Sequence, residues 1–225
     1  MSHLDLELSQ LKADTLKMWS MVNLQLHKAK ESLLNLDKDL AREVIQGEKR
    51  VNATELKIDQ DCENIFALFN PVAIDSRFVL AVLKINNNLE RTGDIAEGIA
   101  KFVINVNHTF DTNLLEIARV VEMFEAAISM MNEVMDAFDK ENTTIARKIF
   151  QKDELLDEIN NKATSTIASY LVQNKENIEP ALYLLSVIRK LERVGDQAKN
   201  MAEEIIFYVE AKVIKHRSLA EKKKS

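Results

Sequence analysis

The chain has 225 residues and a formal net charge of −6, from 30 Lys and Arg against 36 Asp and Glu. This acidic balance argues against a nucleic-acid-binding protein. The single cysteine, Cys62, excludes a disulfide within the chain and favours a reducing compartment such as the cytoplasm. No apolar run is long enough to span a bilayer, and no signal peptide is recognised.

The composition favours an all-α protein, because the chain has only four Gly and two Pro and is rich in Ala, Leu, Lys and Glu. We place Pro71 and Pro180 in connections between helices, since proline ends a helix. We expect Asp75, and either Asp111 or Thr112, to be N-caps. Apolar residues spaced by three and four predict six long helices, in chain order at 5–38, 39–69, 75–107, 112–140, 142–174 and 178–213.

Segments of these helices repeat each other. The sequence Glu-Arg-Thr-Gly-Asp at 90–94 returns as Glu-Arg-Val-Gly-Asp at 192–196, 102 residues later, and 40–45 resembles 145–150. The apolar seam around the first motif also returns around the second, which indicates that the two segments pack in the same way. Its members are Phe78, Val82, Ile85, Leu89, Thr92, Ala96, Ile99 and Val103, and then Leu184, Val187, Leu191, Val194, Ala198, Met201 and Ile205.

The repeat divides the chain into two similar halves. We predict two tandem three-helix bundles, at 1–108 and 109–217, followed by a basic flexible tail at 218–225. Short connections make successive helices antiparallel. One continuous six-helix bundle is the alternative arrangement.

Each half carries two pairs of oxygen-bearing side chains at positions i and i+4, one pair on its second helix and one on its third. Because this spacing places both members on one helix face, the pairs converge if the two helices pack side by side. In the first half Glu97 continues the acidic stripe, whereas its counterpart Lys199 interrupts it and leaves Asn200 to supply an oxygen. The eight paired residues are Glu48, Asn52, Glu90 and Asp94, and then Asp153, Asp157, Glu192 and Asp196.

An isolated acidic pair on a helix is usually a solvated face, since like charges at this spacing cost only about 0.2–0.5 kcal/mol. Two observations favour a site instead. The pairs recur in both halves, and Gly93 and Gly195 occupy the same motif position. Glycine inside a helix costs about 1 kcal/mol relative to alanine, so its placement there indicates close helix approach or ligand access.

Converging carboxylates would favour a bound cation, because uncompensated negative charges repel one another. The donors are all oxygens, which suits iron, Mn²⁺, Mg²⁺ or Ca²⁺, with Zn²⁺ as a further candidate. The four histidines show no ligand spacing to the motifs. No phosphate-binding loop, dinucleotide fingerprint or nucleophile elbow is found in the sequence, so we assign no catalytic residue.

These residues resemble the PhoU family of phosphate-transport regulators. The resemblance rests on tandem three-helix repeats with two acidic motifs each, on the segment Ala-Arg-Glu-Val-Ile-Gln-Gly-Glu-Lys-Arg-Val-Asn at 41–52, on both Glu-Arg-x-Gly-Asp motifs, and on 203–210. It runs from about Leu4 to Arg217.

The resemblance implies a cytoplasmic, non-catalytic regulator of phosphate uptake and of the phosphate-starvation response. It would act as a metal-binding adaptor between the ATPase of the phosphate ABC transporter and a phosphate-sensor histidine kinase, as a homodimer that meets the membrane only through its partners. Some members bind metal clusters through these motifs, so the resemblance implies that the eight paired residues are metal ligands. Asn52 and Lys199 depart from the family pattern, which argues against equal occupancy of the two sites.

A second class of function fits the same residues. Paired carboxylates on helices also occur in carboxylate-bridged metalloenzymes, such as oxidases or phosphohydrolases. The regulatory adaptor better explains why the chain offers no histidine ligands, no general base and no substrate-cradling loop.

Overall fold

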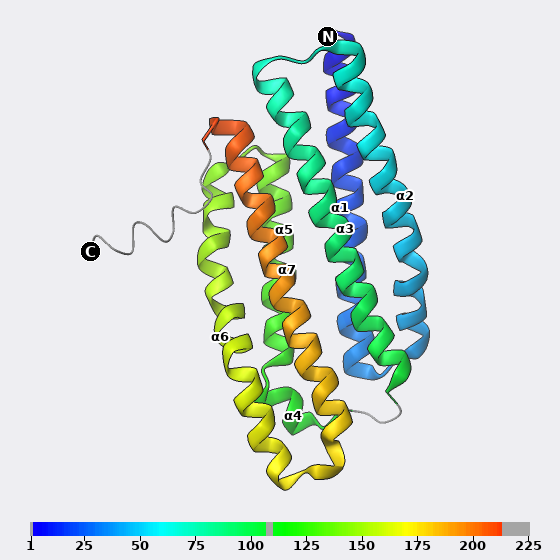
Figure 1. Ribbon diagram of the computed structural model, residues 1–225, viewed down its shortest axis with the longest axis vertical. Coiled ribbons are helices and arrows are strands. Elements are labelled where there is room, and N and C mark those ends of the chain that lie inside the picture. The colour runs from blue at the N-terminus through cyan, green and yellow to red at the C-terminus, as the bar shows by residue number, and fades with distance from the viewer. Residues whose placement is uncertain (1, 107–109, 213–225) are drawn as a thin grey trace, which may run out of the picture.

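The computed structural model describes residues 2–106 and 110–212, and within these ranges it contains seven α-helices, one 3₁₀ helix and no strand. The prediction of an all-α repeated bundle is confirmed (Figure 1). The predicted tail at 218–225 lies outside the described residues, as do the predicted helix ends at 107 and 213. The elements are α1 His3–Asn35, α2 Lys38–Phe69, α3 Ala73–Asn105, α4 Thr112–Ile117, α5 Val120–Asp139, α6 Thr143–Gln173, η1 Lys175–Asn177 and α7 Ile178–Glu210.

The first three helices form one bundle and α5, α6 and α7 form the other. The two bundles pack side by side through α3 against α7 and α1 against α5, while α2 and α6 lie on the outer sides and pack mainly against helices of their own half (Figure 1). None of the helices in the described ranges is both long and apolar enough to cross a membrane.

Three details differ from the sequence expectations. The helix expected at 112–140 is interrupted, because Arg119 adopts a left-handed backbone conformation with φ 54° between α4 and α5. Buried apolar residues continue on both sides of the break, so periodicity alone predicts one helix. The expected cap Asp111 is confirmed, since its side chain accepts a hydrogen bond from the backbone N–H of Asn113 at 2.9 Å.

The cap expected at Asp75 is wrong. Helix α3 begins two residues earlier at Ala73. Asp75 lies in the first turn, where the positive end of the helix dipole stabilises its carboxylate. Pro71 lies in the connection before α3, as expected, but Pro180 lies in the first turn of α7. Proline is tolerated there because the backbone N–H groups of a first turn have no partner within the helix.

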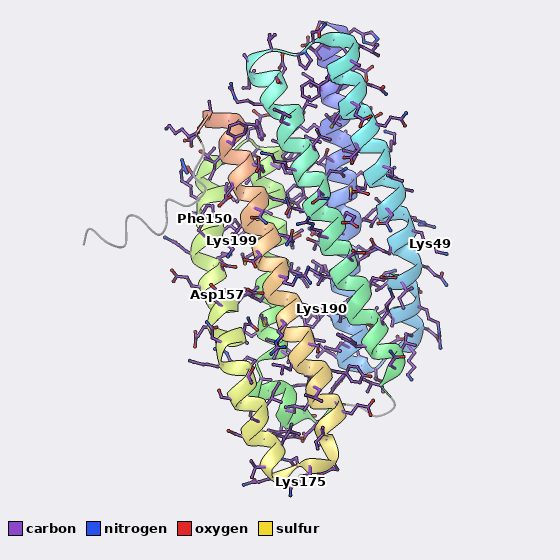
Figure 2. The ribbon with its side chains drawn as sticks, viewed as in Figure 1. Lys49, Phe150, Asp157, Lys175, Lys190 and Lys199 are labelled. Carbon is purple, nitrogen blue, oxygen red and sulfur yellow. The ribbon has the colours of Figure 1, made fainter. Side chains whose placement is uncertain are left out.

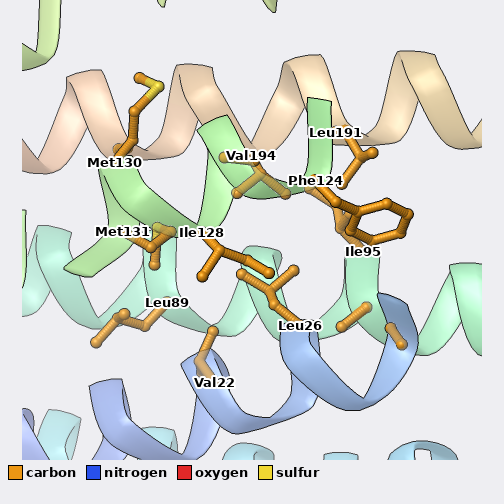
Figure 3. Packing of buried hydrophobic residues seen from close by; sticks show 14 of the residues in the cluster. Val22, Leu26, Leu89, Ile95, Phe124, Ile128, Met130, Met131, Leu191 and Val194 are labelled. Carbon is orange, nitrogen blue, oxygen red and sulfur yellow. The ribbon is translucent and has the colours of Figure 1, made fainter. Parts of the chain in front are cut away.

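One hydrophobic core spans both halves. Every member of the repeated apolar seam is buried, and the buried cluster draws side chains from α1, α3, α5 and α7 (Figure 3). At one end, Phe138 of α5 lies 5.8 Å from the ring of Trp19 and 6.1 Å from that of Phe78, measured between centroids. The indole N–H of Trp19 donates to the carbonyl of Met131 at 3.1 Å, which ties α1 to α5.

Helices α3 and α7 run antiparallel and are related by an approximate two-fold arrangement. Lys84 pairs with Glu204 at 3.0 Å, and each lies nine residues from the glycine of its own motif. Asn200 donates a long hydrogen bond to Asn88 at 3.4 Å, and each lies five residues from that glycine. The two Glu-Arg-x-Gly-Asp motifs therefore face each other where α3 crosses α7.

Because both halves share one core, we expect them to unfold together. Phe138→Ala should lower the free energy of unfolding by about 3–5 kcal/mol, the usual cost of removing a buried aromatic ring. Fluorescence of the only tryptophan, Trp19, in the first half and far-UV circular dichroism should report the same shifted transition. Leu68→Ala serves as the control, since Leu68 is 71% exposed and its loss should change stability by less than about 0.5 kcal/mol. Two separate transitions would contradict a shared core.

Candidate functional site

In the first half, the acidic residues of α2 and α3 converge around Glu48. This side chain is only 4% exposed, and neither of its carboxylate oxygens has a hydrogen-bond partner of normal geometry in the described part of the chain. Burial is the main reason why the pKa of Glu48 is raised to about 7. The charges of Asp94, Glu97 and Glu90 act in the same direction, and the Gln25 amide opposes them. A buried carboxylate without partners is the kind of group that a cation would satisfy.

Gly93 makes room for this carboxylate. A Cβ atom on Gly93 would lie 2.8 Å from Oε2 of Glu48, closer than non-bonded atoms approach each other. Glycine at this motif position leaves room for the carboxylate that α2 brings against the backbone of α3. The close approach expected from the repeated glycine is confirmed.

The other paired residues of this half lie at its edge. Glu90 is half-buried, and burial, followed by the charges of Asp94 and Glu55, raises its pKa. Asn52 is exposed on α2, one turn beyond Glu48, and is not buried with the cluster.

Two acidic residues of α2 that the sequence analysis did not select also face this cluster. Burial and the charges of Asp59 and Asp94 raise the pKa of Glu55. Asp59 accepts a hydrogen bond from the amide of Asn86 at 2.8 Å. Glu55 lies seven residues after Glu48, and this two-turn spacing is the signal that could have identified it.

The second half repeats the arrangement on α6 and α7. Asp153 is 4% exposed, and a Cβ atom on Gly195 would lie 2.8 Å from its Oδ1, so the glycine again seats a buried carboxylate. Burial, with the charges of Asp196 and Asp157, raises the pKa of Glu192. In the second half both pairs therefore lie near each other, whereas in the first half Glu48, Glu90 and Asp94 do so and Asn52 does not.

The halves differ in how this negative charge is balanced. Lys199 pairs with Oδ2 of Asp153 and, at 2.7 Å, with Oδ1 of Asp196. Burial disfavours the Lys199 ammonium, but these hydrogen bonds outweigh it and raise its pKa. The equivalent residue of the first half is Glu97, which adds a negative charge and pairs outward with Lys101 at 2.6 Å. The second cluster thus contains a cation that is ion-paired with its carboxylates, whereas among the described residues no cation is ion-paired with Glu48, Glu90 or Asp94.

The clusters can be compared with the needs of a bound metal ion. Among the described residues, no three His, Cys, Asp or Glu side chains are arranged to hold one ion together. The first cluster nevertheless fits a hard cation better, because several carboxylates surround the buried Glu48 and, in the part of the chain that the structure describes, none of Glu48, Glu90 and Asp94 forms an ion pair. The second cluster fits one poorly, because the Lys199 ammonium already lies against two of its carboxylates.

Comparison with known proteins gives one consistent result. The PhoU domain matches residues 15–103 and 120–205, which include both Glu-Arg-x-Gly-Asp motifs. The phosphate-specific transport system accessory protein PhoU of Escherichia coli K12 is 31% identical over 210 residues, covering 93% of this chain and 86% of that protein.

Two crystal structures of similar proteins have the same fold. PhoU from Pseudomonas aeruginosa superposes with a TM-score of 0.85 at 28% identity and covers 93% of this chain and 100% of its own. The phosphate transport system regulatory protein PhoU from Streptococcus pneumoniae also gives 0.85, at 27% identity, and covers 94% and 99%.

The raised pKa of Glu48 predicts a pH-dependent stability. Between pH 4.5 and about 7 the folded state keeps a proton that the unfolded state releases, so the free energy of unfolding should fall as the pH rises through this window and then level off. Glu48→Gln should remove this decline and stabilise the protein near pH 8 by up to about 3 kcal/mol.

The measurement is urea unfolding at several pH values in the presence of a chelator. Glu31→Gln is the matched control. Glu31 is exposed on α1, so its substitution should leave the pH profile of the protein unchanged. If the Glu48→Gln and Glu31→Gln variants have the same pH profile, the Glu48 carboxyl is not the source of the dependence.

Proposed function

This chain belongs to the PhoU family, and from that membership we propose that it is an accessory regulator of phosphate transport that restrains the phosphate-starvation response. The observation that carries the proposal is the match of both repeats to the PhoU domain. The relatives are named as accessory or regulatory proteins of phosphate transport, not as enzymes. The alternative of a carboxylate-bridged metalloenzyme is therefore not retained.

In this proposal the protein works as a cytoplasmic adaptor. Its partners are the ATPase of the phosphate ABC transporter and a phosphate-sensor histidine kinase, and it reaches the membrane only through them. The two bundles share a core, so contacts on one bundle are held in a fixed orientation to contacts on the other. The exposed faces of α2 and α6, on opposite outer sides, are available to two different partners (Figure 1). The family resemblance also implies a homodimer.

The proposal includes a metal ion at the first acidic cluster. Glu48, Glu90 and Asp94 would hold it after their side chains move closer together, because the structure does not arrange them around one ion, and Asn52 would be a further oxygen donor at the edge. Iron, Mn²⁺, Mg²⁺, Ca²⁺ and Zn²⁺ are the candidates, and the ion would supply positive charge that joins α2 to α3. Asp153, Asp157, Glu192 and Asp196 would form the second site, which we propose is weaker because a metal ion must first displace the Lys199 ammonium.

Exchanging the two equivalent residues tests this asymmetry. Glu97→Lys should lower the metal bound by the first cluster, because it places an ammonium group where the second cluster has one. Lys199→Glu should add a second site of comparable affinity, because it removes the internal counter-ion. Metal content after equilibrium dialysis against Mn²⁺, followed by elemental analysis, is the measurement.

Glu31→Lys makes the same charge change on an exposed face of α1 and is the control. Two equal sites in the natural protein, or the same metal content in the Glu97→Lys and Glu31→Lys variants, would refute the asymmetry. Neither result would bear on the regulatory role.

Deletion of the protein tests the regulatory role. We expect phosphate-starvation genes to be expressed in phosphate-rich medium when the chain is absent, because the adaptor no longer transmits the replete state of the transporter to the kinase. A reporter of a phosphate-uptake promoter measures this, and the natural chain supplied from a plasmid should restore repression. Unchanged expression after clean deletion, in cells without a second copy of the gene, would overturn the proposal.

A further inference from the structure

A basic pocket lies where α3 crosses α7, and its lining includes Asp94 and Glu97, whose charges also act on Glu48 in the first acidic cluster. It has a volume of about 290 Å³ and is lined by eight residues of the two helices. The arginines of the two motifs, Arg91 and Arg193, both line it, so the antiparallel crossing brings equivalent residues of the two halves into one pocket. Lys101 and Lys190 add two further positive charges.

In this pocket the Lys190 side chain lies against a glycine, which leaves space for it, and over an aromatic ring. A Cβ atom on Gly98 would lie 2.6 Å from Nζ of Lys190, and the same Nζ lies 5.5 Å from the centroid of the Phe102 ring, in cation–π contact. Figure 2 shows Lys190 on the side of α7 that faces α3, whereas Lys199 lies on the side towards α6. The residue equivalent to Gly98 is Asn200, so the second half has no glycine at this position.

The positive charges of the pocket are only partly balanced. Glu97 pairs with Lys101 at 2.6 Å, which leaves Asp94 as the other carboxylate in the lining. In the described ranges, no carboxylate lies within ion-pair distance of Arg91, Lys190 or Arg193, so the pocket keeps a net charge of about +2. Burial lowers the pKa of Lys190, and repulsion from Arg193 and Lys101 acts in the same direction. The charge of Asp94 opposes this lowering.

We propose that this pocket binds a small multivalent oxyanion of the phosphate type. Two guanidinium groups present paired N–H donors that match the oxygens of a phosphate, and the Lys190 ammonium adds a point charge. The volume lies at or below the lower end of the range for small-molecule pockets, which suits a single phosphate group or a small phosphate ester. The same chemistry is present in free inorganic phosphate and in the terminal phosphate of a nucleotide.

The test is calorimetric titration of the full chain at low ionic strength, with inorganic phosphate in one arm and ATP in the other. Arg193→Gln and Lys190→Gln should each weaken binding by about tenfold or more, because each removes a charge-assisted hydrogen bond. Gly98→Ala should weaken binding without changing any charge, because the new methyl group displaces the Lys190 ammonium. Similar affinities for both ligands would identify free phosphate as sufficient, and much tighter ATP binding would identify a nucleotide.

Arg189→Gln is the matched control, since Arg189 is exposed on the same helix next to Lys190 but does not line the pocket. Far-UV circular dichroism shows whether each variant keeps its fold, and titrations with and without a chelator separate this site from the acidic clusters. No phosphate or ATP binding by the natural protein, equal affinity in the Arg193→Gln and Arg189→Gln variants, or full competition by chloride at equal concentration would overturn the proposal.

Discussion

The structure depends on a close approach between a buried carboxylate and a helical glycine, which occurs once in each half. Glu48 lies against Gly93 and Asp153 against Gly195, so each pair joins the second helix of its half to the third. Neither element of this contact is explained by stability alone, because glycine weakens a helix and a buried carboxylate loses its hydration. The arrangement therefore concentrates negative charge at the price of stability, which is typical of a site that binds a ligand.

The two halves balance this charge differently, although their backbones follow the same pattern. Lys199 places an ammonium group against the carboxylates of the second half, where it serves as a permanent counter-ion. Glu97 occupies the same position in the first half, where its charge adds to the negative charges that act on Glu48. Two repeats that keep the same glycine and buried carboxylate thus differ, through one residue, between an acidic cluster and an internal ion pair.

The sequence was sufficient to predict the features that depend on local periodicity. The helices, the apolar seam and the repeated glycine all follow from residue spacing along one helix, and the structure confirms them. It could not predict the break at Arg119. Arginine rarely adopts the left-handed backbone conformation seen here, and the apolar pattern continues on both sides of it. The cap expected at Asp75 failed for a related reason, since Val72 precedes α3 without a side-chain hydrogen bond.

Features that depend on which helices meet were harder to predict. The sequence shows Lys199 interrupting an acidic stripe, but its contact with Asp153 follows only from the packing of α7 on α6. The basic pocket was missed altogether, because Arg91 and Arg193 lie 102 residues apart and meet only when α3 crosses α7 antiparallel. Glu55, by contrast, lies seven residues after Glu48, and this two-turn spacing on one helix face is visible in the sequence.

Asp94 links the two candidate sites of the first half. Its charge raises the pKa of Glu48 in the acidic cluster, and it also opposes the lowering of the Lys190 pKa in the basic pocket. A cation held at the acidic cluster would neutralise Asp94 and leave the basic pocket with more positive charge. An oxyanion in the pocket would in turn favour the cation, because thermodynamic linkage between two sites is reciprocal. Since Asp196 is paired with Lys199, the second half lacks the uncompensated carboxylate on which this coupling depends.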